Sequence, residues 1–409
     1  MNYQFSNRIG QIKKNPLRDN ARKNMESSEV ISFAYGFPPE EAFPSEKMAK
    51  ISQSLYELEN HETFLQYGAS EGHPEFLAAL GKRLKNIVGV YDEEEDGLLV
   101  VSGSTQGMDI TVKAFCNEGD IVICEEQTFS GAVNAICSYG AIPMAIPMVG
   151  ESIDIEKLEA AFEADVDHKI KMIYLIPTFQ NPMGTSMPLE DRHKVYDLCL
   201  EYGVMIYEDD PYGDLLYEGE AIPKMKSFDT EGIVIYSGSF SKILAPSTRL
   251  GFLVVPKGVY QPMLLGKQTS DSHTNQYWQL VASKLMTEYD FEGHIEELRD
   301  LYRKRFYAMI DGLDKIDSSL LTYIRPTGGY FLCAKMTDDV VPEKFYDYLI
   351  DKKVAVIPGN VMSVDQTGFE HYFRLNFTKP SVEEITKGMA IIGDALAYAV
   401  VDTQQREGA

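Results

Sequence analysis

The sequence predicts an α/β protein, in which a large domain with a mostly parallel sheet between helices is joined to a smaller α+β domain. The chain has 409 residues, which is too long for one ordinary core. Its middle alternates short apolar runs with amphipathic helical stretches, and this pattern changes from about Asp290. We expect residues 1–50 to form an N-terminal segment that is part of the small domain. Residues 51–289 then form the large domain, and residues 290–409 form the small C-terminal domain.

The expected strands of the large domain are short and β-branched, and most are apolar throughout, as strands covered on both faces are. These strands are Leu98–Val101, Ile121–Cys124, Met172–Ile176, Val204–Tyr207, Ile233–Tyr236 and Leu250–Val254. Helical patterns lie between several of them, at Gln106–Phe115, Gly131–Tyr139 and Leu189–Tyr202. Strand–helix alternation of this kind indicates a mostly parallel sheet with helices on both sides.

The smaller domain is expected to begin with a long amphipathic helix at His294–Leu313. The elements expected after it are a strand around Tyr330–Ala334, a helix near Glu343–Lys352, strands at Val354–Ile357 and Phe373–Phe377, and a final helix from Ser381 towards Tyr398. Strands and helices in this mixed order indicate an α+β fold.

Composition excludes several classes of function. The formal net charge of −24 argues against nucleic-acid binding, because phosphates demand a basic surface. The longest apolar run, Ala141–Val149, is far shorter than a membrane-spanning helix, and the N-terminus has no signal-peptide pattern. The five cysteines form no CxxC pair, and the seven histidines show no paired metal spacing. We therefore expect no metal site, no membrane partner and a cytoplasmic location.

The first polar segment at a predicted strand end follows Leu98–Val101. In open α/β sheets, ligands bind beyond the carboxyl ends of the strands. Here the sequence is Ser102-Gly103-Ser104-Thr105-Gln106-Gly107, and a helix follows. Small residues let the backbone approach an anion, the helix N-terminus offers free N–H groups, and Ser104 and Thr105 add hydroxyl donors. Ordinary helix capping by these residues is the alternative.

Two further strand ends carry polar residues. Asn181-Pro182 follows Met172–Ile176 and is also a good turn signal by itself. Glu208-Asp209-Asp210 follows Val204–Tyr207, and Tyr212 comes three residues after Asp209. Acidic residues at a strand end are usually solvated, but here a tyrosine can share their cleft.

The most specific segment is Ser239-Phe240-Ser241-Lys242, which follows Ile233–Tyr236, with Arg249 seven residues later. A lysine directly after a buried strand is unusual, because burial of an unpaired ammonium is costly. A lysine that forms a Schiff base is the natural exception, and a lowered amine pKa serves nucleophilic catalysis. The hydroxyls and Arg249 then suit a phosphate site. The alternative is a lysine on the surface.

The order and spacing of six residues resemble the class I/II aminotransferases of pyridoxal 5'-phosphate (PLP) fold type I. These residues are Asn181, Asp209, Tyr212, Lys242, Arg249 and Arg374. The resemblance covers nearly the whole chain. The segments Ile31–Pro38 and Leu65–Leu80 resemble most closely the branch of this family that contains 2-aminoadipate and kynurenine aminotransferases.

The resemblance implies a role for each residue around PLP. Lys242 would hold the aldehyde as a Schiff base, and Asp209 would keep the pyridine nitrogen protonated. Asn181 and Tyr212 would bond to the ring hydroxyl oxygen. The residues implied for the phosphate are Ser104, Thr105, Ser239 and Arg249. Phe129 would stack on the ring, with a core phenylalanine as the alternative reading.

The resemblance also implies residues for the substrate and for a partner subunit. Arg374 alternates out of an apolar strand and would bind the substrate α-carboxylate bidentately, and Gly36 would lie at the same site. Tyr67 would reach the cofactor phosphate of a neighbouring subunit, so a homodimer with shared active sites is expected. Arg18 would contact a distal carboxylate of the substrate, although its flanks Asn15 and Asp19 depart from the family pattern. A solvent-facing arginine is its alternative.

The implied function is transfer of an amino group between an amino acid and a 2-oxo acid, with 2-oxoglutarate and glutamate as one pair. Lys242 would first hold PLP and then move the proton at the substrate Cα. The alternative is a PLP-dependent β-lyase or synthase, because fold and cofactor do not settle the reaction. Related domains also occur behind winged-helix modules in bacterial regulators. Only about 30 residues precede Ile31, which are too few for such a module. The acidic net charge also argues against a DNA-binding regulator.

Overall fold

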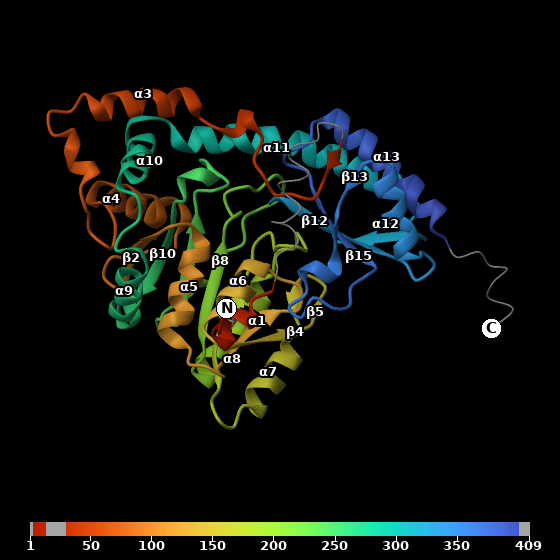
Figure 1. Ribbon diagram of the computed structural model, residues 1–409, viewed down its shortest axis with the longest axis horizontal. Helices are drawn as coiled ribbons and strands as arrows, with labels where there is room; N and C mark the ends of the chain where they lie inside the picture. Colours follow the sequence, from red (N-terminus) through yellow and green to blue (C-terminus); the bar gives the residue numbers. More distant parts are fainter. Residues whose placement is uncertain (1–2, 14–29, 401–409) are drawn as a thin grey trace.

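The computed structural model describes residues 3–13 and 30–400 of the chain. A seven-stranded sheet forms its centre, in the order β2-β10-β9-β8-β7-β3-β4 (Figure 1). Its strands are β2 (Asp96–Val101), β3 (Ile121–Glu125), β4 (Ile142–Ile146), β7 (Ile170–Leu175), β8 (Met205–Asp210), β9 (Val234–Ser239) and β10 (Gly251–Pro256). Neighbouring strands from β9 to β4 run parallel, whereas β10 is antiparallel to both β2 and β9. The predicted α/β class and mostly parallel sheet are confirmed.

Helices cover both faces of this sheet because successive side chains of each strand point to opposite faces. Tyr207 and Ile235 pack on the face covered by α5, α6 and α9, while Ile206 and Val234 pack on the face covered by α7 and α8. The bounds of these helices are α5 (Ser104–Phe115), α6 (Ser130–Ser138), α7 (Ile155–Ala164), α8 (Leu189–Tyr202) and α9 (Lys257–Asp271).

A second sheet lies on the right of Figure 1, in the order β11-β12-β15-β14, and the long helix α11 (Phe291–Leu313) runs along the top of the view towards it. The strands are β11 (Leu321–Tyr323), β12 (Phe331–Met336), β14 (Ile357–Pro358) and β15 (Tyr372–Asn376). Helices α12 (Pro342–Asp351) and α13 (Val382–Tyr398) also belong to this part. Ser381 begins α13 with a capping box to Glu384, so the sequence marks this start well.

The N-terminal part of the chain joins this second region. Strand β1 (Ile31–Ser32) pairs in parallel with β13 (Val354–Ala355), and α13 contacts β1. The predicted single strand at Val354–Ile357 is therefore wrong in one respect, because its two halves pair with different partners. β13 binds β1, and β14 binds β15.

The remaining elements flank the two sheets. They are α1 (Asn7–Gln11), α3 (Ser45–Tyr56), α4 (Pro74–Arg83), α10 (Gln276–Glu288), the short helices η1 (Glu40–Ala42), η2 (His61–Leu65), η3 (Leu84–Val88), η4 (Met225–Phe228), η5 (Pro246–Thr248) and η6 (Gly359–Met362), and the hairpin of β5 (Met148–Val149) and β6 (Ser152–Ile153). Within residues 3–13 and 30–400, none of the helices has the length and apolar character needed to cross a bilayer.

Candidate active site

The sheet topology brings the predicted site residues to one edge. Gly251, at the start of β10, is in register with Val101 at the end of β2 and with Ser239 at the end of β9. Because β10 is antiparallel to both, it begins where they end. Arg249 therefore lies beside the turn after β2 and close to the segment that leads to Lys242. The ends of β8, β7 and β3 follow along the same edge.

The turn after β2 forms a small cradle in front of Arg249. Arg249 Nη2 donates to the carbonyl of Ser102 at 3.1 Å. Gly103 has φ +84°, and a Cβ there would lie 2.0 Å from Arg249 Nη2, so only glycine fits this position. Ser104 and Thr105 begin α5, whose first N–H groups have no intrahelical acceptor. Ser239 lies across β10 from this turn, and its Oγ accepts the N–H of Ser241 at 3.1 Å.

Asp209 is the penultimate residue of β8 and a buried carboxylate with 5% exposure. Its Oδ2 accepts the Tyr174 hydroxyl at 2.8 Å. Its Oδ1 has no partner with hydrogen-bond geometry among the described residues, although Ser237 faces it on β9 and favours the ionised form. Burial raises the pKa of Asp209 to about 7. Because Oδ1 has no hydrogen-bond partner among the described residues, it can accept a hydrogen bond from a cationic group beside it, and such a group would lower the pKa of Asp209.

Lys242 is half-buried, and its Nζ donates to the carbonyl of Gly36 at 2.7 Å. The same Nζ lies 5.0 Å from the ring centroid of Tyr330. Burial lowers the pKa of Lys242 to about 8, and the nearby guanidinium groups of Arg374 and Arg249 lower it further in the same direction. A lowered pKa increases the fraction of neutral, nucleophilic amine at neutral pH.

Arg374 extends from β15 of the second sheet towards the loop after β7. Its guanidinium donates to Asn181 Oδ1 at 2.7 Å and to the carbonyl of Ala34 at 2.8 Å, and its carbon lies 4.0 Å from the ring centroid of Phe331. Burial lowers the pKa of Arg374 to about 10. Tyr212 lies in the same layer, with its ring 5.7 Å from that of Phe331. One side of the site thus consists of a buried arginine and packed aromatic rings.

Two further predicted residues make other contacts, and a third is not described. Phe129 is half-buried immediately before α6, where it packs beside Gly131. Tyr67 is 85% exposed, and its ring meets only that of His273, at 5.9 Å, among the ring contacts of the described residues. It does not join the site of its own chain. Arg18 lies outside the described residues.

Two partners of the predicted residues were not found by sequence reasoning. Tyr174 holds Asp209 because Tyr174 is in register with Tyr207, two residues before Asp209 on the same face of the sheet. The signal was a hydroxyl inside an otherwise apolar strand. Gln180 donates to Glu125 Oε2 at 3.0 Å and accepts the N–H of Met183 at 2.7 Å, so it fixes the turn that carries Asn181.

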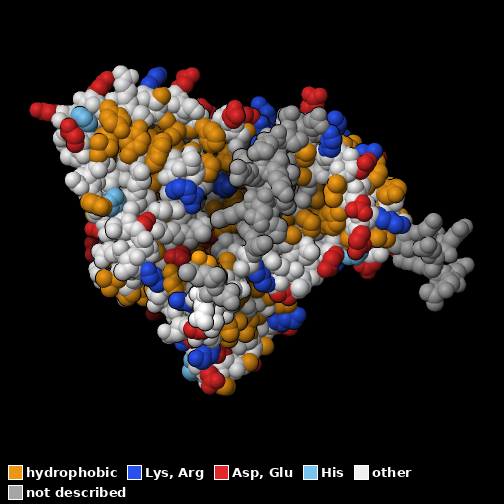
Figure 2. Space-filling view, viewed as in Figure 1, with side chains coloured by type: hydrophobic (Ala, Val, Ile, Leu, Met, Phe, Trp, Pro, Cys, Tyr) orange, Lys and Arg blue, Asp and Glu red, His pale blue; other side chains and the backbone are white. Residues whose placement is uncertain are grey.

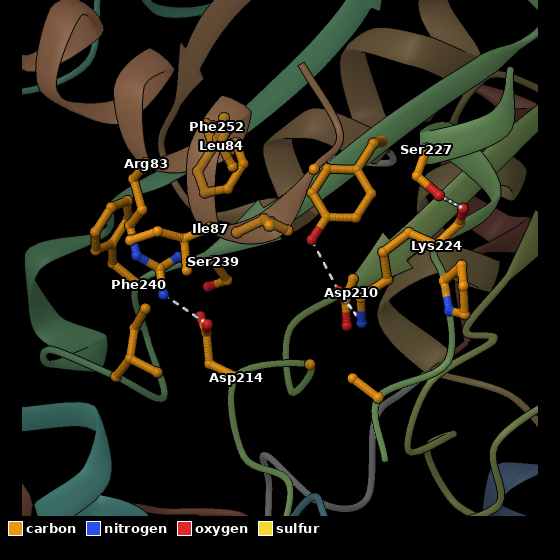
Figure 3. A pocket seen from close by; sticks show the side chains of 18 of the residues that line it. Arg83, Leu84, Ile87, Asp210, Asp214, Lys224, Ser227, Ser239, Phe240 and Phe252 are labelled. Atoms are coloured by element: carbon orange, nitrogen blue, oxygen red, sulfur yellow. Dashed lines mark hydrogen bonds and ion pairs between the residues drawn. The ribbon is translucent and has the colours of Figure 1, made fainter. Parts of the chain in front are cut away.

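A cavity of about 400 Å³ lies behind the end of β8 (Figure 3). Asp210 points into it, opposite to Asp209, and pairs with Lys224 at 2.7 Å. On another side of the cavity, Arg83 pairs with Asp214 at 2.6 Å. Ser239 also lines this cavity, so the cavity borders the segment that leads to Lys242.

Comparison with known proteins gives a consistent result. The family model described as aminotransferase class I and II matches residues 28–392. The chain is 31% identical to the aromatic-amino-acid aminotransferase 1 of Thermococcus litoralis, over 96% of this chain and 94% of that relative. It is 31% identical to the 2-aminoadipate transaminase of Thermus thermophilus, over 96% of each chain. It resembles the crystal structure of a kynurenine aminotransferase of Pyrococcus horikoshii in complex with PMP, with a TM-score of 0.90, 33% identity and 96% of each chain covered.

Proposed function

Because the chain belongs to the class I and II aminotransferase family, we propose that the residues gathered at the strand ends bind PLP and carry out amino-group transfer. The chain is a PLP-dependent transaminase of fold type I. The observation that carries the residue assignment is the convergence of one buried carboxylate, one lysine and two arginines at a single edge of the sheet.

The residues present fit PLP in three places. Asp209 offers a buried oxygen that suits the protonated ring nitrogen. The Gly103 turn, the start of α5 and Arg249 suit the phosphate, for which an N–H cradle and a guanidinium are the preferred partners. Lys242 offers an amine of lowered pKa for the aldehyde. When bound, PLP supplies the aldehyde that takes up the amino group and the protonated ring that accepts electrons.

We assign the proton transfers to Lys242. Its amine holds the cofactor at rest, and it becomes a free base when the substrate amine replaces it. In the neutral form it takes the proton from the substrate Cα. Asp209 stays ionised beside the ring nitrogen, because a cationic partner lowers the pKa of a buried carboxyl. Phe129 is assigned to the ring face, and Asn181 and Tyr212 to the ring hydroxyl.

We assign Arg374 to the substrate α-carboxylate. It is buried, and its Nε has no hydrogen-bond partner among the described residues. A carboxylate can take the place of one of its present acceptors, Asn181 Oδ1 or the Ala34 carbonyl. Gly36 lies two residues after Ala34 and contacts Lys242, so we place it at the same substrate site.

For the substrates, we propose glutamate and 2-oxoglutarate as one pair. Support comes from two relatives, which are named as an aromatic-amino-acid aminotransferase and a 2-aminoadipate transaminase. The amino acids in these two names have different side chains. Arg18 stays our prediction for the group that meets a distal carboxylate. We also keep the cytoplasm as the proposed compartment, since the five cysteines are free thiols.

The test separates the two halves of the reaction. Holoenzyme is mixed with one amino acid at a time, without an oxo acid, and the cofactor absorption is followed. A donor should convert the cofactor to PMP, and later addition of 2-oxoglutarate or pyruvate should restore PLP. Release of ammonia without formation of PMP would instead indicate a lyase.

We propose that the working enzyme is a homodimer with shared sites. Figure 2 shows apolar side chains gathered over α3 and α10, at the upper left of the view. The exposed apolar residues of this region include Tyr56, Leu58, Leu65 and Tyr67. A contiguous exposed apolar patch is typical of a protein interface. A second subunit on this patch would cover it and would bring Tyr67 to the phosphate site of its neighbour.

A further inference from the structure

Helix α9 carries an ion pair directly behind the turn that follows β2, in which the lysine is buried and the aspartate side chain is 26% exposed. Lys267 is fully buried, with 0% exposure. Its Nζ donates to Asp271 Oδ1 at 2.5 Å, to Thr274 Oγ1 at 3.0 Å and to Gln106 Oε1 at 3.3 Å. All three protons of the ammonium therefore have an acceptor inside the protein.

The pair reaches the turn through Asp271. Its Oδ2 accepts the Ser102 hydroxyl at 2.8 Å and the Gln106 side-chain amide at 2.8 Å. Gln106 in turn accepts the backbone N–H of Ser102 at 2.6 Å. Ser102 is thus bound at its N–H and at its hydroxyl, while its carbonyl accepts Arg249.

The same network extends in the opposite direction, towards Tyr67. Thr274 Oγ1 donates to the carbonyl of Val100 at 3.3 Å, and the carbonyl of Thr274 accepts Gln279 Nε2 at 2.9 Å. Gln279 Oε1 accepts the N–H of His73 at 2.7 Å. One connected set of bonds therefore joins the turn after β2 to the segment that follows Tyr67.

Stability alone does not account for such a pair. Burial lowers the pKa of Lys267, against the opposing effect of Asp271, so the ammonium is held here at a desolvation cost. Apolar side chains of similar volume would fill the space without that cost. The pair instead fixes the position of Ser102, a contact that apolar side chains cannot make.

We infer that Lys267 and Asp271 are a positioning pair that holds the Ser102–Ser104 turn and Arg249 in the geometry that receives the cofactor phosphate. Neither residue touches the phosphate. The inference rests on the proposed phosphate site, and it adds that this site is preorganised in the apoprotein. Loss of the pair should weaken binding of the phosphate group selectively.

The test compares PLP with pyridoxal, which lacks the phosphate. Apoproteins of wild type, Lys267→Met and Asp271→Asn are titrated with each compound, and the dissociation constants are measured from absorption and fluorescence. The PLP constant should rise about tenfold in both variants, because bonds to a charged group are lost, while the pyridoxal constant changes much less. Inorganic phosphate should also compete less well with PLP in the variants.

The matched control is Lys194→Met. Lys194 pairs with Glu190 at the same i,i+4 spacing and at 2.7 Å, but this pair is exposed on α8, outside the proposed subunit interface. The control should leave both constants unchanged. Thermal melting of each apoprotein shows whether it is folded. If Lys267→Met does not fold, Asp271→Asn still tests the pair, because asparagine has the same shape as aspartate.

Two results would overturn the inference: an equal loss of affinity for PLP and pyridoxal, or no loss for either. A different result would contradict the proposed phosphate site itself: wild-type protein that binds PLP no better than it binds pyridoxal.

Discussion

At the scale of single residues, burial shifts the pKa values of two groups on which the site assignment depends, Asp209 and Lys242. Burial raises the pKa of Asp209 to about 7 and lowers that of Lys242 to about 8. The shift increases the neutral, nucleophilic fraction of Lys242, whereas Asp209 becomes fully ionised only when a cationic partner lies beside it and lowers its pKa. The first prediction concerns the carboxylate and the second concerns the amine.

Asp209→Asn should bind PLP but lose activity about a hundredfold or more, because an amide cannot hold the ring nitrogen protonated. The shape of the side chain and the bond to Tyr174 are retained, so the fold should not change. Turnover and cofactor absorption are measured together. Unchanged turnover would mean that another acid does this work.

Capture of PLP by the apoprotein should accelerate with rising pH through a midpoint near 8, rather than near the ordinary lysine value of 10.5. The sign follows from the chemistry, since only the neutral amine attacks the aldehyde and its fraction grows above the pKa. Stopped-flow absorption across pH 6 to 10 measures the midpoint. A rate still rising at about pH 10 would show that burial does not lower this pKa.

At the scale of elements, the sequence predicts where most central strands lie, but neither their ends nor their directions. Strands β8 and β9 each run three residues further than expected, to Asp210 and Ser239, and β4 was not expected. The apolar runs identified most central strands, and α8 begins and ends as expected at Leu189 and Tyr202. The antiparallel direction of β10 has no local signal, yet it brings Arg249 to Ser102–Ser104. Helix α9 was missed, and it contains Pro262.

Contacts across the sheet were missed for a related reason. Tyr174 meets Asp209 through the register of β7 and β8, and Lys267 meets Ser102 only through tertiary packing. A single sequence contains neither register nor packing. Residues just beyond the apolar runs could be predicted as site residues because their position follows from the fold class alone. The domain limits at residues 50 and 289 stay a proposal.

Gly103→Ala should weaken PLP binding by displacing Arg249, in addition to the backbone strain of a positive φ. Gly89→Ala is the matched control, because Gly89 has a similar φ of +77° but nothing within 4 Å of an added Cβ. The backbone strain alone should cost about 1–2 kcal/mol of stability in each variant. Only Gly103→Ala should also reduce PLP affinity. Equal affinities in the two variants would show that the turn does not shape the phosphate site.

At the scale of the whole molecule, the homodimer that we propose can be tested through Tyr67. Among the described residues, Tyr67 is 85% exposed and its ring contacts only that of His273, and the apolar side chains around it are exposed to solvent. If each subunit lends Tyr67 to the other, two different inactive variants can repair one another in a mixed dimer.

Lys242→Ala and Tyr67→Ala proteins should therefore be denatured together, refolded and assayed. In a mixed dimer one site has both defects and the other has none, so random assortment should restore about a quarter of the activity expected from intact sites. Each variant refolded alone is the control. No gain on mixing, with mixed dimers present by mass, would place Tyr67 outside the neighbouring site.

The central claim is that Lys242 holds the cofactor covalently, and reduction of the holoenzyme with borohydride tests it most directly. Reduction makes the link permanent, and proteolysis followed by mass spectrometry identifies the modified lysine. We predict one pyridoxyl phosphate group per chain, on the peptide that contains Ser239-Phe240-Ser241-Lys242. A modified lysine elsewhere in the chain, or no modified peptide from a protein that shows PLP absorption, would contradict the account.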